Sequence, residues 1–150
     1  MLFESQINIE KNSKQVMNFL LNCENVLRCF RGVENVQIKD RRFSAKVKFD
    51  VSAANVAEMS MVTATVDGEY VNVTDNSLEI SLNIRIVGIR SKAHIYVNLN
   101  DLDESHTLLN IRVDFDPGLI FKMFPFMNNL VNIIYNNNLQ DFINCIKTRI

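Results

Sequence analysis

The chain has 150 residues, of which 47% are hydrophobic, and a formal net charge of −1. This length fits one domain, residues 1–150, which can bury roughly 70% of the surface that its unfolded chain exposes. A nearly neutral chain carries no electrostatic signal for nucleic acid, so we expect no nucleic-acid partner. Its cysteines are widely spaced, with no CxxC pair and no Cys/His cluster, which predicts neither a disulfide framework nor a metal site.

The N-terminal sequence gives no targeting signal. Residues 1–11 contain no basic segment followed by an apolar one, so no secretion signal is expected. The sequence also lacks a run of about 18 apolar residues, the length needed to cross a bilayer. We therefore predict a cytoplasmic location.

One strand and two short helices are predicted before residue 32. Residues 3–9 alternate between apolar and polar, which is typical of a half-buried strand. Asn12 or Ser13 can cap a helix that follows. The apolar stripe of that helix consists of Val16, Phe19, Leu20 and Cys23. A second helix is predicted over residues 24–31, and Gly32 is expected to end it because glycine tolerates a positive φ.

From residue 36 onward the apolar pattern changes to a period of two residues. Alternating segments lie at residues 36–39, 43–51, 78–86, 93–99 and 109–115. They predict an antiparallel meander with one dry face and one wet face. Short links at Asp40-Arg41, at residues 75–77 and at residues 101–104 fit tight connections between strands.

The stretch from residue 62 to residue 73 has two interpretations. Its apolar residues at 62, 64 and 66 share one parity, whereas those at 71 and 73 share the other. A hairpin turn at Asp67-Gly68 explains this change, and a bulge at Gly68 within one long strand explains it equally well.

The last segment, residues 117–150, has the period of a helix. At 100° per residue its apolar side is formed by Phe124, Met127, Leu130, Val131, Ile134, Phe142, Cys145 and Ile146. Proline is tolerated in a first turn, so Pro125 places the start of the helix near Phe124. A long apolar stripe must cover a broad apolar surface, and the dry face of the sheet supplies one. The order of elements therefore predicts an α+β fold in which a curved antiparallel sheet grips the C-terminal helix.

Three segments carry a resemblance to a known family. They are Cys23–Val33, Asp67–Val71, and Asn110–Gly118 together with the long helix that follows. With them the chain resembles the helix-grip (START-like, SRPBCC) superfamily, which includes START lipid-transfer domains, polyketide cyclases and the birch-pollen allergen. Within this superfamily it most resembles the carbon monoxide dehydrogenase CoxG-like family.

The resemblance has structural and functional implications. It implies about seven strands around a long C-terminal helix, with two short helices after the first strand, and it favours the bulge at Gly68. It also implies a lipid- or quinone-like ligand, or an accessory role beside a molybdenum hydroxylase such as carbon monoxide dehydrogenase.

The predicted dry face offers little for catalysis. Ser5 is its one clear polar residue, and no Asp, Glu, His or Lys points inward. His94 and His106 fall on the wet face or at a strand edge, where we expect solvated side chains. Because acid/base catalysis needs a titratable group beside the substrate, no catalytic residue is assigned. A polyketide cyclase- or hydratase-like enzyme is the alternative, and it would require a strand shifted by one residue.

We therefore expect an apolar cavity between sheet and helix that binds a small hydrophobic ligand, without a metal or cofactor. The predicted ligand-binding residues are Asn138, Ile134, Val131, Met127, Phe142, Phe49, Leu82, Ile95 and Ile111. Asn138, together with Tyr135, is the candidate polar anchor, although its amide can instead satisfy a backbone group. Cys29 and Cys145 are expected to be buried thiols that act as small hydrophobic residues.

The segment Leu119–Met127 is apolar on all sides. One interpretation is that it closes one end of the core. The other is that it forms a lid, a homodimer contact, or a patch that contacts a membrane or another protein. A protein–protein interaction module with a filled core is accordingly the third function considered.

Overall fold

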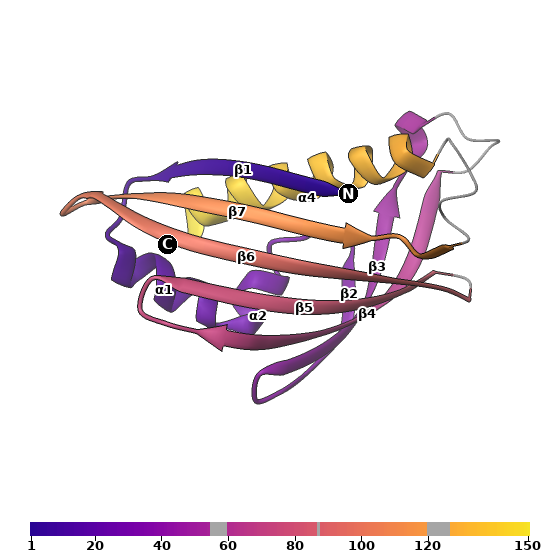
Figure 1. Cartoon of the computed structure of the whole chain (residues 1–150), viewed down its shortest axis with the longest axis horizontal. Coiled ribbons are helices and arrows are strands. Elements are labelled where there is room, and N and C mark those ends of the chain that lie inside the picture. Colours follow the sequence, from indigo (N-terminus) through magenta and orange to yellow (C-terminus); the bar gives the residue numbers. More distant parts are fainter. Residues whose placement is uncertain (55–59, 87, 120–126) are drawn as a thin grey trace.

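A computed structural model describes residues 1–54, 60–86, 88–119 and 127–150. Its elements in chain order are β1 (Leu2–Ile9), α1 (Ser13–Leu21), α2 (Cys23–Leu27), β2 (Val33–Lys39), β3 (Arg42–Asp50), η1 (Ser52–Ala54), β4 (Met61–Val73), β5 (Ser77–Ile86), β6 (Ile89–Asp103), β7 (His106–Asp116) and α4 (Met127–Arg149). The strands form one seven-stranded sheet in the order β1-β7-β6-β5-β4-β3-β2, with every neighbouring pair antiparallel. The sheet is strongly curved, and the three α-helices pack against one side of it, here called the inner face (Figure 1). The predicted α+β helix-grip architecture is confirmed.

The first helix begins where the sequence allows it. Of the two candidate caps, Asn12 is the N-cap, because its side chain accepts a hydrogen bond from the Gln15 backbone N–H at 2.9 Å. The Gln15 side chain accepts one in return from the Asn12 backbone, which completes a capping box. The residues of α1 that are buried are Val16, Met17, Phe19 and Leu20.

The connection from α2 to β2 differs from the prediction. The second helix spans Cys23–Leu27 and is therefore shorter than residues 24–31. Gly32 is also needed for another reason than a positive φ, since the glycines with positive φ are Gly88 and Gly118. The Lys48 backbone N–H donates to the Gly32 carbonyl at 2.8 Å, and a β-carbon at Gly32 would overlap the carbonyl of Lys48. Gly32 thus allows the chain to approach β3 closely.

The change of parity in β4 comes from a bulge. Met61–Val73 is one continuous strand, which excludes the hairpin at Asp67-Gly68. Its register against β5 shifts between Tyr70 and Asn72, so the bulge lies near Val71 and not at Gly68. Gly68 keeps the inward parity, and a β-carbon there would overlap the ring of Phe43. The bulge was predicted correctly, but its position was wrong.

The strand connections are mostly shorter than predicted. The Asp40-Arg41 link is confirmed, because Lys39 pairs with Arg42 and Asp40 has a φ of 55°. The links after β4 and β6 shrink to residues 74–76 and 104–105, because the strands continue beyond their last alternating apolar residue.

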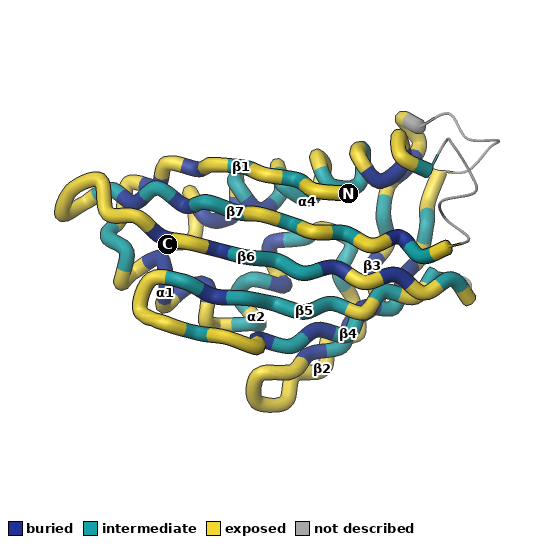
Figure 2. The backbone as a smooth tube through the Cα atoms, viewed as in Figure 1, coloured by how far each residue is buried: buried dark blue, intermediate teal, exposed yellow. Residues whose placement is uncertain are grey.

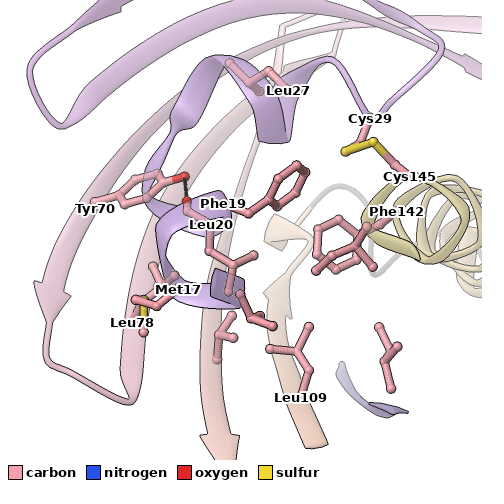
Figure 3. Packing of buried hydrophobic residues seen from close by; sticks show 14 of the residues in the cluster. Met17, Phe19, Leu20, Leu27, Cys29, Tyr70, Leu78, Leu109, Phe142 and Cys145 are labelled. Carbon is pink, nitrogen blue, oxygen red and sulfur yellow. Dashed lines mark hydrogen bonds between the residues drawn. A yellow bond between two sulfur atoms is a disulfide. The ribbon is translucent and has the colours of Figure 1, made fainter. Parts of the chain in front are cut away.

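The densest core lies at the α1 end of the sheet. Its fully buried large side chains include Ile9, Leu78, Leu109, Ile146 and Val16. Figure 3 shows α1 residues facing Phe142 of α4 and Leu109 of β7. The Tyr70 hydroxyl donates to the Leu20 carbonyl at 2.8 Å, which ties α1 to β4.

Cys29 and Cys145 are joined by a disulfide, so the prediction of two buried thiols was wrong. Their Cα atoms lie 5.3 Å apart although the residues are separated by 116 positions. The bond joins the segment after α2 to the C-terminal half of α4 (Figure 3). Spacing along the chain could not reveal this pair, because the fold alone brings its two segments together. Cys23 is free, and burial raises its pKa to about 11.

The outer face of the sheet carries a polar network, which confirms that His94 lies on the wet face. Glu79 accepts a hydrogen bond from the Asn72 side-chain amide at 2.9 Å, and His94 Nε2 lies 3.1 Å from its carboxylate. The His94 ring stacks on Tyr96, and the Arg112 guanidinium lies 4.3 Å from the centre of the Tyr96 ring. The hydrogen bond from Asn72, followed by that from His94, lowers the pKa of Glu79.

We expect acid to weaken the fold partly through Glu79. Since its pKa in the folded chain lies below the ordinary value of 4.5, the ionised side chain stabilises the folded state above that pH. This contribution is lost as the pH falls through the lowered pKa. Glu79→Gln should therefore reduce the change in melting temperature between about pH 6 and pH 3. Glu10→Gln, at an exposed residue, is the control, and equal pH slopes for both variants would show that the network has no such effect.

Candidate ligand-binding site

The inner face is well covered at the α1 end and only partly covered at the other end (Figure 2). On β7, Leu109 is fully buried, whereas Ile111, Val113 and Phe115 are half-buried. On β5, Leu78 is buried, whereas the inward residues from 80 to 86 are half-buried. The described part of the chain therefore leaves an apolar area partly uncovered on the same face that holds the core.

We call this area the half-buried inner surface. Its sheet residues are Ser5, Phe49, Ile80, Leu82, Ile84, Ile95 and Ile111, and its helix residues are Ile134, Tyr135 and Asn138. Several of them are neighbours across strands, since Ile80 pairs with Ile95 and Ile111 pairs with Val97. The area is contiguous with the core rather than a set of isolated exposed residues.

Most of the predicted ligand-binding residues belong to this area or border it. Phe49, Leu82, Ile95, Ile111, Ile134 and Asn138 are half-buried, and Met127, at the start of α4, is half-buried as well. The other two predicted residues are packed more tightly. Phe142 lies in the core, with its ring stacked on Phe30 at a centroid distance of 6.3 Å, and Val131 is also buried. These two support the helix rather than present themselves to a ligand.

Asn138 satisfies the backbone, which was the structural alternative in the sequence analysis. Its Nδ2 donates to the Ile134 carbonyl, one helical turn earlier, at 2.8 Å. The polar pair on the half-buried inner surface is instead formed by Ser5 and Tyr135, whose hydroxyl oxygens lie 2.7 Å apart. The Phe3 ring stacks on Tyr135 at a centroid distance of 4.3 Å, which holds the phenol in place. Both residues were noted from the sequence, but their pairing was not predicted.

Two further inward hydroxyls were missed, because the predicted strands were too short. Ser91 and Thr107 have the inward parity of β6 and β7 and lie two residues before the predicted strands begin. Both are buried, and each bonds to the backbone: Ser91 Oγ donates to the Pro117 carbonyl at 3.3 Å, and Thr107 Oγ1 donates to the Lys11 carbonyl at 2.8 Å. They stabilise the ends of the sheet and leave Ser5 and Tyr135 as the hydroxyls of the half-buried inner surface.

The chemistry of this surface is apolar contact plus hydrogen bonding. Among the described strand residues of inward parity there is no Asp, Glu, His or Lys. Residues 1–54, 60–86, 88–119 and 127–150 also contain no cluster of three or more His, Cys, Asp or Glu that could hold a metal ion. His106, the second histidine, lies at the β6–β7 turn, where its Nδ1 is 2.8 Å from an Asp103 carboxylate oxygen.

Two grooves occur elsewhere on the described surface. One, of about 620 Å³, lies beside the β2–β3 hairpin and includes Arg42, Asp67 and Glu69 in its lining. The other, of about 650 Å³, lies between α2 and β2 and includes Phe30, Val36 and Ile38. Neither contains a predicted ligand-binding residue.

The predicted contact segment Leu119–Met127 falls mostly outside the described residues. Leu119 is 83% exposed and Met127 is half-buried, whereas residues 120–126 are not described. Its role as a membrane, protein or homodimer contact stays a prediction. None of the helices that the structure describes has the length and apolar character to span a membrane.

Comparisons with known proteins agree with this geometry. A conserved protein from Geobacillus kaustophilus superposes with a TM-score of 0.78 at 10% identity, covering 97% of this chain and 95% of that one. A START superfamily protein from Mycobacterium smegmatis gives a TM-score of 0.67 at 8% identity, with 97% and 96% covered. The ZhuI aromatase/cyclase from Streptomyces sp. R1128 gives 0.66 at 12% identity, with 97% and 90% covered.

At these identities the solved structures establish the fold alone. No curated protein matches the sequence. The model of the carbon monoxide dehydrogenase CoxG family matches residues 5–150, which is nearly the whole chain. The chain therefore belongs to the carbon monoxide dehydrogenase CoxG family of START-like helix-grip proteins.

Proposed function

We propose that this chain binds or carries a small hydrophobic ligand, lipid- or quinone-like, between the sheet and α4. The supporting observation is the half-buried inner surface, where apolar side chains that would normally be covered remain partly accessible. Each 100 Å² of apolar surface that a ligand covers contributes roughly 2.5 kcal/mol before the costs of association. Apolar burial therefore supplies most of the binding free energy.

The Ser5–Tyr135 pair orients the ligand. In a pair of hydroxyls one O–H donates to the other, which leaves a second O–H free to donate to a ligand oxygen. The described inner-face residues of the strands include no basic side chain to neutralise an anionic head group. An uncharged ligand with a carbonyl or hydroxyl oxygen suits this surface better than a phosphate or an ionised fatty acid.

Tyr135→Phe tests this orientation. Removing one hydroxyl should lower the affinity for Nile red, an uncharged dye with a ring carbonyl, by roughly 3- to 10-fold, because one net hydrogen bond contributes about 1 kcal/mol. Fluorescence titration measures the affinity. Tyr96→Phe, on the outer face, is the matched control and should bind as the wild type does. An unchanged affinity in Tyr135→Phe would show that the phenol does not orient the ligand.

The family suggests a partner as well. We propose that the chain acts as an accessory protein of a carbon monoxide dehydrogenase-type system and does so in the cytoplasm. The support is the family description alone. Affinity purification from cells that express such an enzyme tests it, and the enzyme should be recovered with the wild type and not with an unrelated bait.

The two alternative functions have less support. A cyclase- or hydratase-like enzyme needs an inward titratable group, and the described strands supply none on this face except tyrosine. The Tyr70 phenol is bonded to the Leu20 carbonyl, and burial raises its pKa, so it is a poor acid or base near neutral pH. An interaction module with a filled core does not explain why the apolar side chains of β5 and β7 remain half-buried.

A further inference from the structure

The C-terminal half of α4 is fastened to the segment after α2 by three adjacent interactions. The disulfide joins Cys29 to Cys145, and the Phe30 ring stacks on Phe142. The Arg31 guanidinium donates from Nε to Asp141 at 2.9 Å. Three consecutive residues thus contact three positions within about one turn of the helix. The disulfide is the covalent member of this set.

The half of α4 that lies over the half-buried inner surface is held by weaker contacts. Tyr135 contacts Ser5 and Phe3, and the Asn137 amide donates to the Asp50 carbonyl at a long 3.4 Å. Residues 128–140 contain no charged side chain and are rich in asparagine, which has a low helix propensity. This half therefore depends on packing for its order, and the firm attachment at its other end limits how far it can move.

We propose that the Cys29–Cys145 disulfide is a redox-dependent fastening of α4, so that its oxidation state sets how long a ligand stays on the half-buried inner surface. The part of this inference that concerns ligand retention rests on the proposed function. The part that concerns the order of the helix does not.

The chemistry is thiol–disulfide exchange with a small thiol such as glutathione. A glutathione thiolate attacks one sulfur and breaks the Cys29–Cys145 bond, and the released cysteine thiolate takes up a proton. A second glutathione then displaces the mixed disulfide, which yields two protein thiols and one glutathione disulfide. The reverse reaction consumes glutathione disulfide and restores the bond.

Access to the bond gives the exchange its character. Cys29 is 6% exposed and Cys145 is 7% exposed, so a thiolate reaches either sulfur only after the α4 end opens locally. The exchange should be slow in the closed protein. In a reducing compartment, where disulfides are uncommon, the loosened dithiol form would prevail, and oxidation would fasten the helix.

Hydrogen exchange and probe release test the inference on the full chain. In the oxidised wild type, amides of residues 141–149 should be protected about tenfold more than after reduction with a phosphine, because one covalent constraint is removed. Nile red should dissociate about tenfold faster from the reduced protein, as measured by stopped-flow dilution. Cys29→Ser/Cys145→Ser should behave as the reduced wild type with or without phosphine, and Cys23→Ser should behave as the oxidised wild type.

Each outcome is decisive. Equal amide protection in oxidised and reduced protein would overturn the fastening, whatever the ligand does. Changed protection with equal Nile red release would overturn the link to the ligand and leave the proposed function standing. Absence of Nile red binding in both states would count against the proposed function, while amide protection would still report on the fastening. A reduced chain and a double variant that both unfold would make the bond a requirement for folding and would overturn its role as a switch.

Discussion

Reduction of the Cys29–Cys145 disulfide will lower the melting temperature of this protein by roughly 10 °C. The bond closes a loop across 116 residues, and the loss of unfolded-chain entropy for a loop near that length is about 4–5 kcal/mol in the chain-entropy model. Native disulfides commonly contribute about 2–5 kcal/mol, and each 1 kcal/mol shifts the melting temperature of a chain this long by roughly 2–4 °C. Thermal unfolding followed by circular dichroism, with and without a phosphine reductant, measures the shift.

The variants of the cysteines make this result specific. Cys29→Ser/Cys145→Ser should melt near the reduced wild type and should be insensitive to the reductant. Cys23→Ser removes the free thiol and should keep the full response to the reductant. A wild type whose melting temperature is the same in both conditions would show that the bond does not stabilise the fold.

Leu82→Glu should weaken Nile red binding by at least roughly tenfold. Leu82 lies near the middle of β5 on the half-buried inner surface, where the carboxylate would lose water as a ligand covers it. Covering an unpaired charge with an apolar molecule costs several kcal/mol, which exceeds the binding contribution of the lost leucine contacts. Fluorescence titration of the folded variant measures the loss.

The neighbouring residue provides the matched control. Asn83 lies next to Leu82 on the same strand but points to the outer face, so Asn83→Glu adds the same charge on the opposite side of the sheet. It should bind Nile red within about twofold of the wild type. Leu82→Trp fills the same space without a charge and serves if Leu82→Glu does not fold. Wild-type binding by both Leu82 variants would place the ligand elsewhere.

Periodicity in the sequence was sufficient to predict the architecture. Alternation places one side chain in two on the inner face, and this rule gave the correct inward residues on β3, β5, β6 and β7. The cap at Asn12 also follows from local chemistry, because its partner Gln15 lies within the same helical turn. Features that depend on neighbours along the chain can be predicted in this way.

Features that depend on contacts across the fold could not be predicted. The disulfide joins residues whose proximity results from the packing of α4, and Gly32 is required by the close approach of β3. The Ser5–Tyr135 pair likewise joins the first strand to the last helix. The inward hydroxyls of Ser91 and Thr107 were missed for a simpler reason, since hydrogen bonding extends both strands beyond their apolar residues.

Native mass spectrometry of the purified chain tests the central claim most directly. We predict that the protein carries a bound small molecule of added mass, and that organic extraction will release an uncharged, hydrophobic compound with a carbonyl or hydroxyl oxygen. Leu82→Glu should be purified without it, whereas Asn83→Glu should retain it. A wild type that is purified empty and shows no thermal shift with any member of a hydrophobic ligand panel would contradict the account and would favour a filled core that serves a protein contact.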